Sequence, residues 1–173
     1  MKFLFASDVH GSVFDMNLLA ERISEEKPDK AIFLGDFCGR SEGKLFRKAV
    51  EKITAPILYV DGNCDDDETL SRYGLESMGF EHVDYAFGRR IYCTHGHIKN
   101  RFCPPDYLTD GDLFCYGHLH TPFIEKQNGI WFINCGSMAR PRGGAQKTYA
   151  VVEDGVARIK EGEFGETLVE VTL

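Results

Sequence analysis

Five apolar runs in this sequence each end at a polar side chain that could bind a metal ion. Asp8 and His10 follow the first run, and Asp36 and Asn63 follow the next two. Because ligands bind at the carboxyl ends of strands in open α/β sheets, the polar side chains are predicted to meet at one sheet edge. The seven candidate metal ligands are Asp8, His10, Asp36, Asn63, His95, His118 and His120.

Two pairs of candidates are separated by a single residue: Asp8 with His10, and His118 with His120. On an extended backbone, residues two apart point to the same side, so each pair is predicted to present two donor side chains in the same direction. Carboxylate, carboxamide and imidazole donors without a thiolate suit Mn, Fe, Ni, Co or Zn better than an all-oxygen calcium site. Each motif alone is also typical of a helix cap or a turn. Together they favour a metal site, because packing alone would have to place four histidines at strand ends.

The elements that must position these side chains follow from hydrophobic periodicity. The first half is predicted to alternate strands at 2–7, 30–34 and 56–61 with helices at 14–25, 43–53 and 66–73. The second half is predicted to consist of strands at 85–87, 90–94, 113–116, 123–126, 130–133, 148–153, 156–160 and 167–173. Asn128-Gly129 and Asp154-Gly155 are strong hairpin turn signals. We therefore expect one domain, residues 1–173, in which two mixed sheets pack together with helices outside.

Length and composition fit such a domain. The 173 residues are 43% apolar and 12% aromatic, enough for a sizeable core without disulfides or a structural metal. No apolar run approaches the roughly 20 residues of a membrane span. The first apolar run reaches Asp8 too soon for a secretory signal. We expect a cytoplasmic protein with no membrane association.

The charge and the cysteine content limit the classes of molecule that this protein is expected to bind. Twenty Lys and Arg against 27 Asp and Glu give a net charge of −7. No basic stripe is visible, which disfavours an extended nucleic-acid interface. A small phosphate ester stays compatible with this charge, because bound metal ions can supply local positive charge. The six cysteines form no zinc-finger or CxxC pattern, and most are expected to be reduced and buried.

Taken in order, the motifs resemble the calcineurin-like metallophosphoesterase superfamily. Its signature is D-x-H, G-D, G-N-[HCN]-[DE], a lone H and G-H-x-H, and in this chain the blocks lie at 8–10, 35–36, 62–65, 95 and 117–120. The segment Asn134-Cys135-Gly136-Ser137, with Arg140-Pro141 after it, also resembles the N-P-G-S segment of small prokaryotic phosphodiesterases of the YfcE type. Five blocks in order make this resemblance specific over most of the chain.

The resemblance implies a four-layer α/β/β/α sandwich with a dinuclear metal site at the carboxyl ends of the strands. By analogy, the first ion would be held by Asp8, His10, Asp36 and His120. The second would be held by Asp36, Asn63, His95 and His118, which assigns Asp36 as the bridge and gives Asp36 and Asn63 catalytic roles. Two divalent ions, expected to be Mn²⁺ with Ni²⁺, Fe, Co or Zn²⁺ as alternatives, would share a hydroxide that attacks phosphorus. The implied activity is that of a phosphodiesterase or a phosphatase of broad specificity.

The sequence departs from the family at the expected proton donor. Many members carry His after the Asn of the third block, whereas this chain has Cys64. A thiol, with a reference pKa of about 8.5, matches neutral pH less well than imidazole, so we expect slower turnover of esters with basic leaving groups. His97 is a second candidate proton donor or phosphate contact. Arg40 and Arg140 are candidate substrate-binding residues, because a guanidinium fork suits phosphate; for these three residues a solvent-exposed role is an equal alternative.

Two other functions fit parts of the pattern. A scaffold similar to the retromer subunit of this fold would lack key ligand histidines, whereas all seven ligand positions are filled here. A metallo-β-lactamase-type hydrolase needs H-x-H-x-D-H, but His120 is followed by Thr121-Pro122. An enzyme acting on a small phosphate ester is thus preferred, with its natural substrate undetermined. Open edges on the late strands leave a homodimer or a tetramer as further options.

Overall fold

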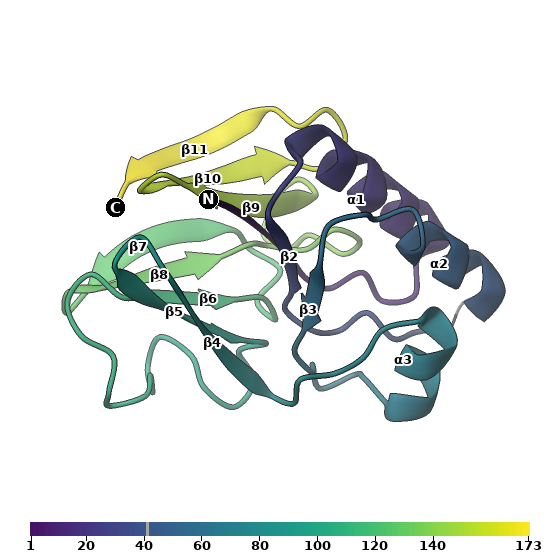
Figure 1. The fold of residues 1–173 in the computed structure, drawn as a ribbon, viewed down its shortest axis with the longest axis horizontal. Coiled ribbons are helices and arrows are strands. Elements are labelled where there is room, and N and C mark those ends of the chain that lie inside the picture. Colours follow the sequence, from purple (N-terminus) through teal and green to yellow (C-terminus); the bar gives the residue numbers. More distant parts are fainter. Residues whose placement is uncertain (41) are drawn as a thin grey trace.

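Two mixed sheets form the centre of the structure, a computed structural model that describes residues 1–40 and 42–173 (Figure 1). The first sheet has the order β11-β10-β9-β1-β2-β3 and the second β4-β5-β6-β8-β7. Their strands are β1 (Lys2–Ala6), β2 (Lys30–Phe33), β3 (Ile57–Tyr59), β4 (Glu81–Ala86), β5 (Arg89–Thr94), β6 (Leu113–Tyr116), β7 (Phe123–Gln127), β8 (Ile130–Asn134), β9 (Thr148–Glu153), β10 (Val156–Glu161) and β11 (Thr167–Thr172). The helices are α1 (Val13–Glu26), α2 (Gly43–Val50) and α3 (Asp67–Tyr73).

Each sheet combines parallel and antiparallel pairing, which confirms the predicted α/β class with two mixed sheets. In the first sheet β1, β2 and β3 are parallel, and in the second β5, β6 and β8 are parallel. The two predicted hairpin turns join β7 to β8 and β9 to β10. Asn128 and Gly129 have φ of 52° and 85°, positive at both central positions as the favoured two-residue hairpin turn requires.

The outer strand β4 begins earlier than the sequence predicted. The expected strand covered only residues 85–87, whereas β4 starts at Glu81 and pairs with β5 along its whole length. Residues 81–84 show little apolar alternation, because β4 lies at the edge of its sheet and none of its side chains is fully buried. The periodicity that identifies a strand depends on a buried face, and this strand does not have one.

Three cores separate the layers. Leu4 and Ala6 of β1 pack toward the helices, whereas Phe3 and Phe5 pack between the sheets, so this strand is apolar on both faces. In Figure 1 the three helices lie together on the side of the first sheet. None of the helices in the described part of the chain is long and apolar enough to cross a membrane.

The predicted outer helix layer over the second sheet is not found in the described residues. The outer face of that sheet, including Tyr92 and Phe114, packs instead on Leu108 from the connection between β5 and β6. This connection contains Pro104-Pro105 and Gly111, residues that oppose helix formation. The layers are therefore helix, sheet, sheet and loop, which corrects the α/β/β/α expectation at its last layer.

One ion-pair network joins the end of α1 to the first sheet. Glu26 accepts a hydrogen bond of 3.1 Å from Lys2 of β1 and one of 3.2 Å from the Tyr149 hydroxyl of β9, and it pairs with Lys160 of β10. Its side chain is only 11% exposed. Burial raises the pKa of Glu26, but the two lysines outweigh burial and hold the pKa below its ordinary value.

We predict that Glu26→Gln lowers the free energy of unfolding at neutral pH by about 1–2 kcal/mol, because it removes a charged acceptor shared by three donors. A carboxylate with a lowered folded-state pKa stabilises the fold above its unfolded pKa, and this contribution is lost as pH falls through the folded pKa. The gap between wild type and variant in urea unfolding should therefore shrink as the pH falls below the ordinary pKa of a glutamate side chain. Glu21→Gln, at an exposed position on the same helix, is the control; equal effects of the two changes would contradict the network.

Candidate metal centre

Five loops at the carboxyl ends of β1, β2, β3, β5 and β6 carry the candidate ligands. Backbone hydrogen bonds join neighbouring loops to each other. The His10 N–H donates to the Asp36 carbonyl at 2.9 Å, and the Gly117 N–H donates to the His95 carbonyl at 3.1 Å. Movement of one loop would therefore break hydrogen bonds in the next, so the five loops form one interlocked unit.

The first group of donor atoms comes from Asp8, His10 and His120. Asp8 is fully buried, and its Oδ1 lies 2.9 Å from Nε2 of His120 and 3.6 Å from Nε2 of His10. The two Nε2 atoms are 3.4 Å apart. Among the described residues, Asp8 Oδ1 has no well-directed hydrogen bond. A buried carboxylate oxygen that faces two imidazole nitrogens fits a divalent cation as the missing partner.

The second group lies beside the first. Asp36 Oδ2 is 3.4 Å from His95 Nε2, and this nitrogen is 3.2 Å from His118 Nδ1. Donor atoms of Asp8, Asp36 and His95 all lie within 4.8 Å of one another. The two groups are thus near enough to hold neighbouring cations, and the donors present fit the two-ion arrangement that the sequence predicted.

Two of the imidazoles are held by carbonyl groups. His95 Nδ1 lies 2.7 Å from the Leu34 carbonyl, and His120 Nδ1 lies 2.5 Å from the Arg140 carbonyl. Because a carbonyl oxygen can only accept, each Nδ1 carries the proton and each Nε2 presents its lone pair to the donor group. Histidines that bind metals commonly use their second nitrogen in this way.

Each carboxylate divides its two oxygens between the fold and the site. Asp8 Oδ2 accepts the His118 N–H at 3.0 Å, and Asp36 Oδ1 accepts the Cys64 N–H at 2.8 Å. Burial raises the pKa of Asp36, but the His95 imidazole and the Cys64 N–H outweigh burial and hold the pKa well below its usual range. Asp36 is therefore a carboxylate at neutral pH and available to a cation.

The backbone at the ligands is unusual. Asp8, His10, Asp36, His118 and His120 have φ between 48° and 63°. Non-glycine residues in this left-handed region cost about 1–3 kcal/mol each and cluster at functional sites. The sequence predicted that the members of each closely spaced pair point to the same side of an extended strand. Asp8 and His10 do converge, but through left-handed turns after the strand. His118 and His120 instead divide between the two donor groups, His118 beside His95 and His120 beside Asp8.

Two glycines allow the loops to approach one another. A Cβ on Gly117 would lie 2.0 Å from Ser7 Oγ, and a Cβ on Gly62 would lie 2.1 Å from Asp36 Oδ1. Both distances are far shorter than any non-bonded contact. Any larger residue at either position would push a carboxylate loop away from the site.

A family model described as the calcineurin-like phosphoesterase superfamily domain matches residues 1–154. The chain belongs to this superfamily. It is 28% identical over 172 residues to phosphodiesterase YfcE of Escherichia coli strain K12, a match that covers 92% of this chain and 91% of the relative. It is 31% identical over 158 residues to the probable metallophosphoesterase YsnB of Bacillus subtilis strain 168, covering 88% and 83%.

Solved structures share the fold. The structure of YfcE, a phosphoesterase from E. coli, matches with a TM-score of 0.90 at 24% identity over 99% of both chains. A structure of Vps29 from Entamoeba histolytica in complex with zinc matches with a TM-score of 0.67 at 15% identity, over 99% of this chain and 98% of that chain. The predicted resemblance to the calcineurin-like superfamily and its YfcE-type branch is confirmed.

The predicted proton donors lie beside the donor groups of this phosphoesterase. Cys64 offers its Sγ within 4.8 Å of donor atoms of His10 and Asp36. Burial, followed by the nearby Asp36 carboxylate, raises the pKa of the Cys64 thiol to about 11. The His97 ring centre lies 5.4 Å from that of His95.

The remaining predicted residues lie at the surface. Asn63 is exposed, and its amide donates to Cys64 Sγ at 3.3 Å. Arg140 is exposed, but burial and then the Arg140 charge lower the pKa of His10 against the pull of Asp8, which places the guanidinium charge near the first donor group. Arg40 is exposed. The structural roles of Asn63 and Arg40 stay predictions.

Sequence reasoning missed Asp65 as a positioning residue. Its Oδ2 accepts the N–H groups of Asp36 and Gly62, at 2.8 and 2.7 Å, and the Tyr59 hydroxyl at 2.7 Å. Its Oδ1 accepts the Cys38 N–H at 2.9 Å. One carboxylate therefore fixes the loop after β2 to the loop after β3. The available signal was the acidic residue that ends the Gly-Asn-Cys-Asp block.

The segment after β8 supports the site from the other side. Asn134 Nδ2 donates to the Gly117 carbonyl at 2.6 Å, and Ser137 Oγ donates to the Asp8 carbonyl at 2.8 Å. The same Ser137 oxygen accepts the Arg140 N–H at 2.8 Å. The N-C-G-S resemblance thus marks side chains that hold the ligand loops rather than side chains that reach the ions.

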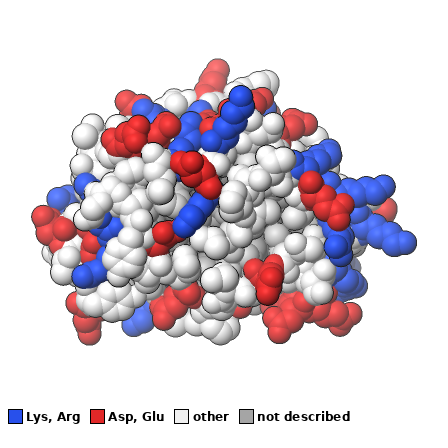
Figure 2. Space-filling model, in the orientation of Figure 1, with Lys and Arg blue, Asp and Glu red and all other residues white. Residues whose placement is uncertain are grey.

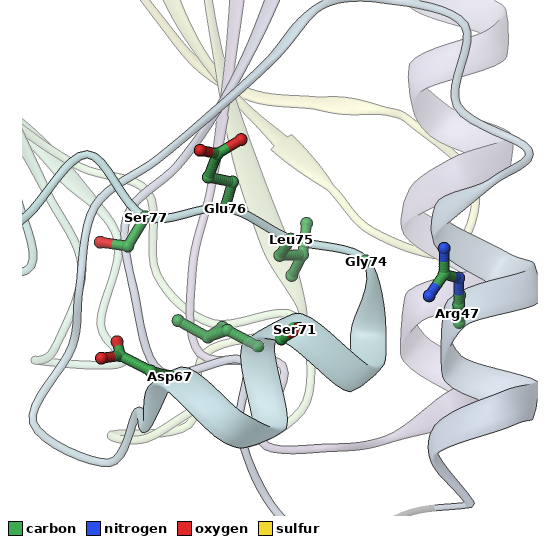
Figure 3. Close-up of a pocket in the computed structure, with 8 residues that line it drawn as sticks. Arg47, Asp67, Ser71, Gly74, Leu75, Glu76 and Ser77 are labelled. Atoms are coloured by element: carbon green, nitrogen blue, oxygen red, sulfur yellow. The ribbon is translucent and has the colours of Figure 1, made fainter.

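A pocket of 560 Å³ lies between α2 and α3, apart from the candidate metal ligands (Figure 3). Arg47 of α2 lies on one side, and Asp67 and Ser71 of α3 lie on the other. None of the seven candidate ligands is among the described residues that line it. Size alone therefore does not locate the chemistry, which lies with the donor groups at the sheet edge.

We predict that Asp65→Asn lowers the free energy of unfolding by about 2–3 kcal/mol, because an amide cannot accept all four hydrogen bonds and a charged acceptor is lost. The substitution should also displace Asp36 and so weaken the binding of divalent ions. The ion concentration needed for a given thermal stabilisation should rise about 10- to 100-fold, as it does when supporting residues are lost from metal sites. Thermal unfolding across a Mn²⁺ titration measures both effects. Asp67→Asn, an exposed neighbour, is the control, and unchanged Mn²⁺ dependence in Asp65→Asn would contradict the assigned role.

Proposed function

We propose that this phosphoesterase is a metal-dependent phosphodiesterase that hydrolyses a P–O bond of a small phosphate ester. The observation that carries the proposal is Asp8 Oδ1, which has no well-directed hydrogen bond within the described part of the chain and faces the Nε2 atoms of His10 and His120 beside the pair formed by Asp36 and His95. A buried carboxylate oxygen without a well-directed donor is costly, and cations at these positions would satisfy it. Membership of the superfamily and the likeness to YfcE support the reaction class.

The ligand sets follow the two donor groups. Asp8, His10 and His120 would hold one divalent ion, His95, His118 and Asn63 the other, with Asp36 between them. When bound, such ions polarise a phosphoryl oxygen and activate water for attack on phosphorus. The protein's contribution is preorganisation, because hydrogen bonds fix His95, His120 and both carboxylates before a substrate arrives.

Residues around the donor groups would handle the proton and the phosphate. Cys64 remains a thiol at neutral pH, so it can donate a proton to a departing alkoxide but does so weakly. His97 is the second candidate donor, on the side of His118. The charge of Arg140 lowers the pKa of His10, which supports a role for Arg140 in pairing with a phosphate oxygen, and Arg40 remains a candidate for the same role.

Charge and topology support a small substrate and one domain. On the face shown in Figure 2, acidic and basic side chains are interspersed, with basic ones gathered mainly at the end where α2 lies. This mixture and the net charge of −7 favour a small phosphate ester over an extended nucleic acid. Strand β1 pairs with β2 on one side and β9 on the other, which joins the two halves of residues 1–173 in one sheet.

The finer assignments belong to this proposal as well. Mixed carboxylate and imidazole donors support Mn²⁺, with Ni²⁺, Fe, Co and Zn²⁺ as alternatives. All six cysteines are free thiols, which supports a reducing compartment such as the cytoplasm. The strand β11 lies at an open sheet edge, which keeps a homodimer or a tetramer among the options.

A scaffold of the same fold is the alternative function. A scaffold needs an interaction surface but gains nothing from five strained, left-handed backbone positions at buried or half-buried polar side chains. The filled ligand positions and their supporting hydrogen bonds therefore favour the enzyme.

We predict that metal-stripped protein hydrolyses bis-p-nitrophenyl phosphate only after a divalent ion is restored, with Mn²⁺, Ni²⁺, Zn²⁺ and Mg²⁺ added separately. Asp36→Asn and His120→Ala should each lose about 100-fold or more of the restored rate and the thermal stabilisation by the ion. His82→Ala is the matched histidine control, because His82 lies on β4 outside the donor groups. Folded wild-type protein that turns over with none of the ions would contradict the enzyme and favour the scaffold.

We predict that Cys64→His raises kcat/KM about tenfold or more for diesters with basic leaving groups, because imidazole is the better acid near neutral pH. Activated p-nitrophenyl esters should change little. The measurement is the slope of log kcat/KM against leaving-group pKa, with Cys103→His, at the other exposed cysteine, as the control and His97→Gln in parallel. An identical slope for wild type and Cys64→His would exclude Cys64 from the proton-donor position.

A further inference from the structure

A second, smaller pocket of 290 Å³ adjoins the metal centre on the side of His118. Its walls come from the loop after β5, including His97 and Phe102, and from Tyr116, His118 and Leu119. The His118 ring therefore belongs both to the second donor group and to the pocket wall. A phosphate ester whose phosphorus lies at the donor groups would reach this pocket with one of its substituents.

The pocket contains an aromatic platform. Phe102 is 80% exposed, and the Arg101 guanidinium carbon lies 5.0 Å from the centre of its ring. The same guanidinium lies 5.2 Å from the Phe123 ring and pairs with Glu125 at 3.0 Å. Arg101 is thus held by three neighbours and supports Phe102, whose ring remains largely open to solvent. An exposed aromatic ring with such support is suited to stack against another flat ring.

Polar groups at the pocket favour a ring that carries hydrogen-bond acceptors. Asn100 Oδ1 is occupied by the Phe102 N–H at 2.9 Å, which leaves the Asn100 amide nitrogen as a donor. His97 Nδ1 is buried and has no hydrogen-bond partner among the described residues. Glu125 balances the charge of Arg101, so the pocket carries no surplus cation for a second phosphate.

The size of the pocket limits what it can hold. Ligand pockets run from about 300 to 1,000 Å³, so 290 Å³ suits one ring system rather than a long or branched chain. A neutral, flat heteroaromatic ring with acceptor atoms satisfies the platform, the donors and the volume together. The base of a nucleotide has these properties.

We propose that the pocket next to His118 binds the base of a nucleotide ester, with Phe102 as the stacking residue that determines specificity. This inference rests on the proposed function, because the donor groups would hold the phosphate while the pocket holds the base. Phe102 touches the substituent of the substrate and not the reacting phosphorus, so its loss should reduce discrimination between substituents without disturbing the metal centre.

The test compares two ligands that differ only in the base: adenosine 5′-phosphate and ribose 5-phosphate. Titration calorimetry on Mn²⁺-loaded protein should show about tenfold tighter binding of the nucleotide, equivalent to about 1.4 kcal/mol. Phe102→Ala should reduce the ratio of the two dissociation constants to near one and leave that of ribose 5-phosphate unchanged. Phe102→Trp should preserve the ratio. Phe164→Ala, which removes another exposed phenylalanine away from this pocket, should behave as wild type.

Equal affinities of the two ligands for wild type, or an unchanged ratio in Phe102→Ala, would overturn the base pocket. Hydrolysis of bis-p-nitrophenyl phosphate on the same samples separates this result from the proposed function. Turnover without base discrimination overturns only the pocket. If the protein discriminates between the two ligands through Phe102 but hydrolyses the diester with none of the ions, the result supports the base pocket and overturns the phosphodiesterase.

Discussion

The burial of two carboxylates at one sheet edge is the constraint on which the rest of the structure depends. Asp8 is fully buried and Asp36 is 3% exposed, and an ionised carboxylate removed from water is costly unless it is paired. In each carboxylate, one oxygen accepts a hydrogen bond from a backbone N–H of a neighbouring loop, and the other oxygen faces imidazole nitrogens. The first oxygen thus stabilises the loop arrangement, and the second favours the binding of a cation. Fold and metal binding are therefore coupled through the same two side chains.

This arrangement explains why strained backbone persists at the site. Left-handed φ values at the ligands cost free energy, and loops with such values would relax if they were independent. They are not independent, because backbone hydrogen bonds join them and Asp65 and Ser137 tie them to their neighbours. The parallel strands beneath are buried on both faces and supply a rigid base. Preorganisation of the donors is thus a property of the whole sheet edge rather than of any single loop.

The sequence was sufficient to predict which side chains meet but not how they meet. Asp8 and Asp36 follow β1 and β2 of the first sheet, whereas His95 follows β5 of the second. The pattern placed each of them at the carboxyl end of a strand, and the packing of the two sheets on each other brings these strand ends together. The left-handed turns were not predicted, because the alternation that marks a strand says nothing about the residues after it. Asp65 was missed because its role is to accept four donors that only the folded loops bring together. The predicted outer helix layer fails for a similar reason, since family analogy does not report how a particular connection covers a sheet.

The connection between β5 and β6 also explains how the residues that perform the reaction can be separated from the residues that select the substrate. The donor groups lie on short loops that are interlocked, so a change in one loop disturbs the others. The connection between β5 and β6 instead packs Leu108 onto the outer face of the second sheet and carries Phe102 beside His118. It is anchored in the core at one point and exposed at another, so its exposed part can change without loss of the anchor. A loop in place of a helix layer thus leaves the phosphoester chemistry to the sheet edge and gives substrate selection to a segment that can vary independently.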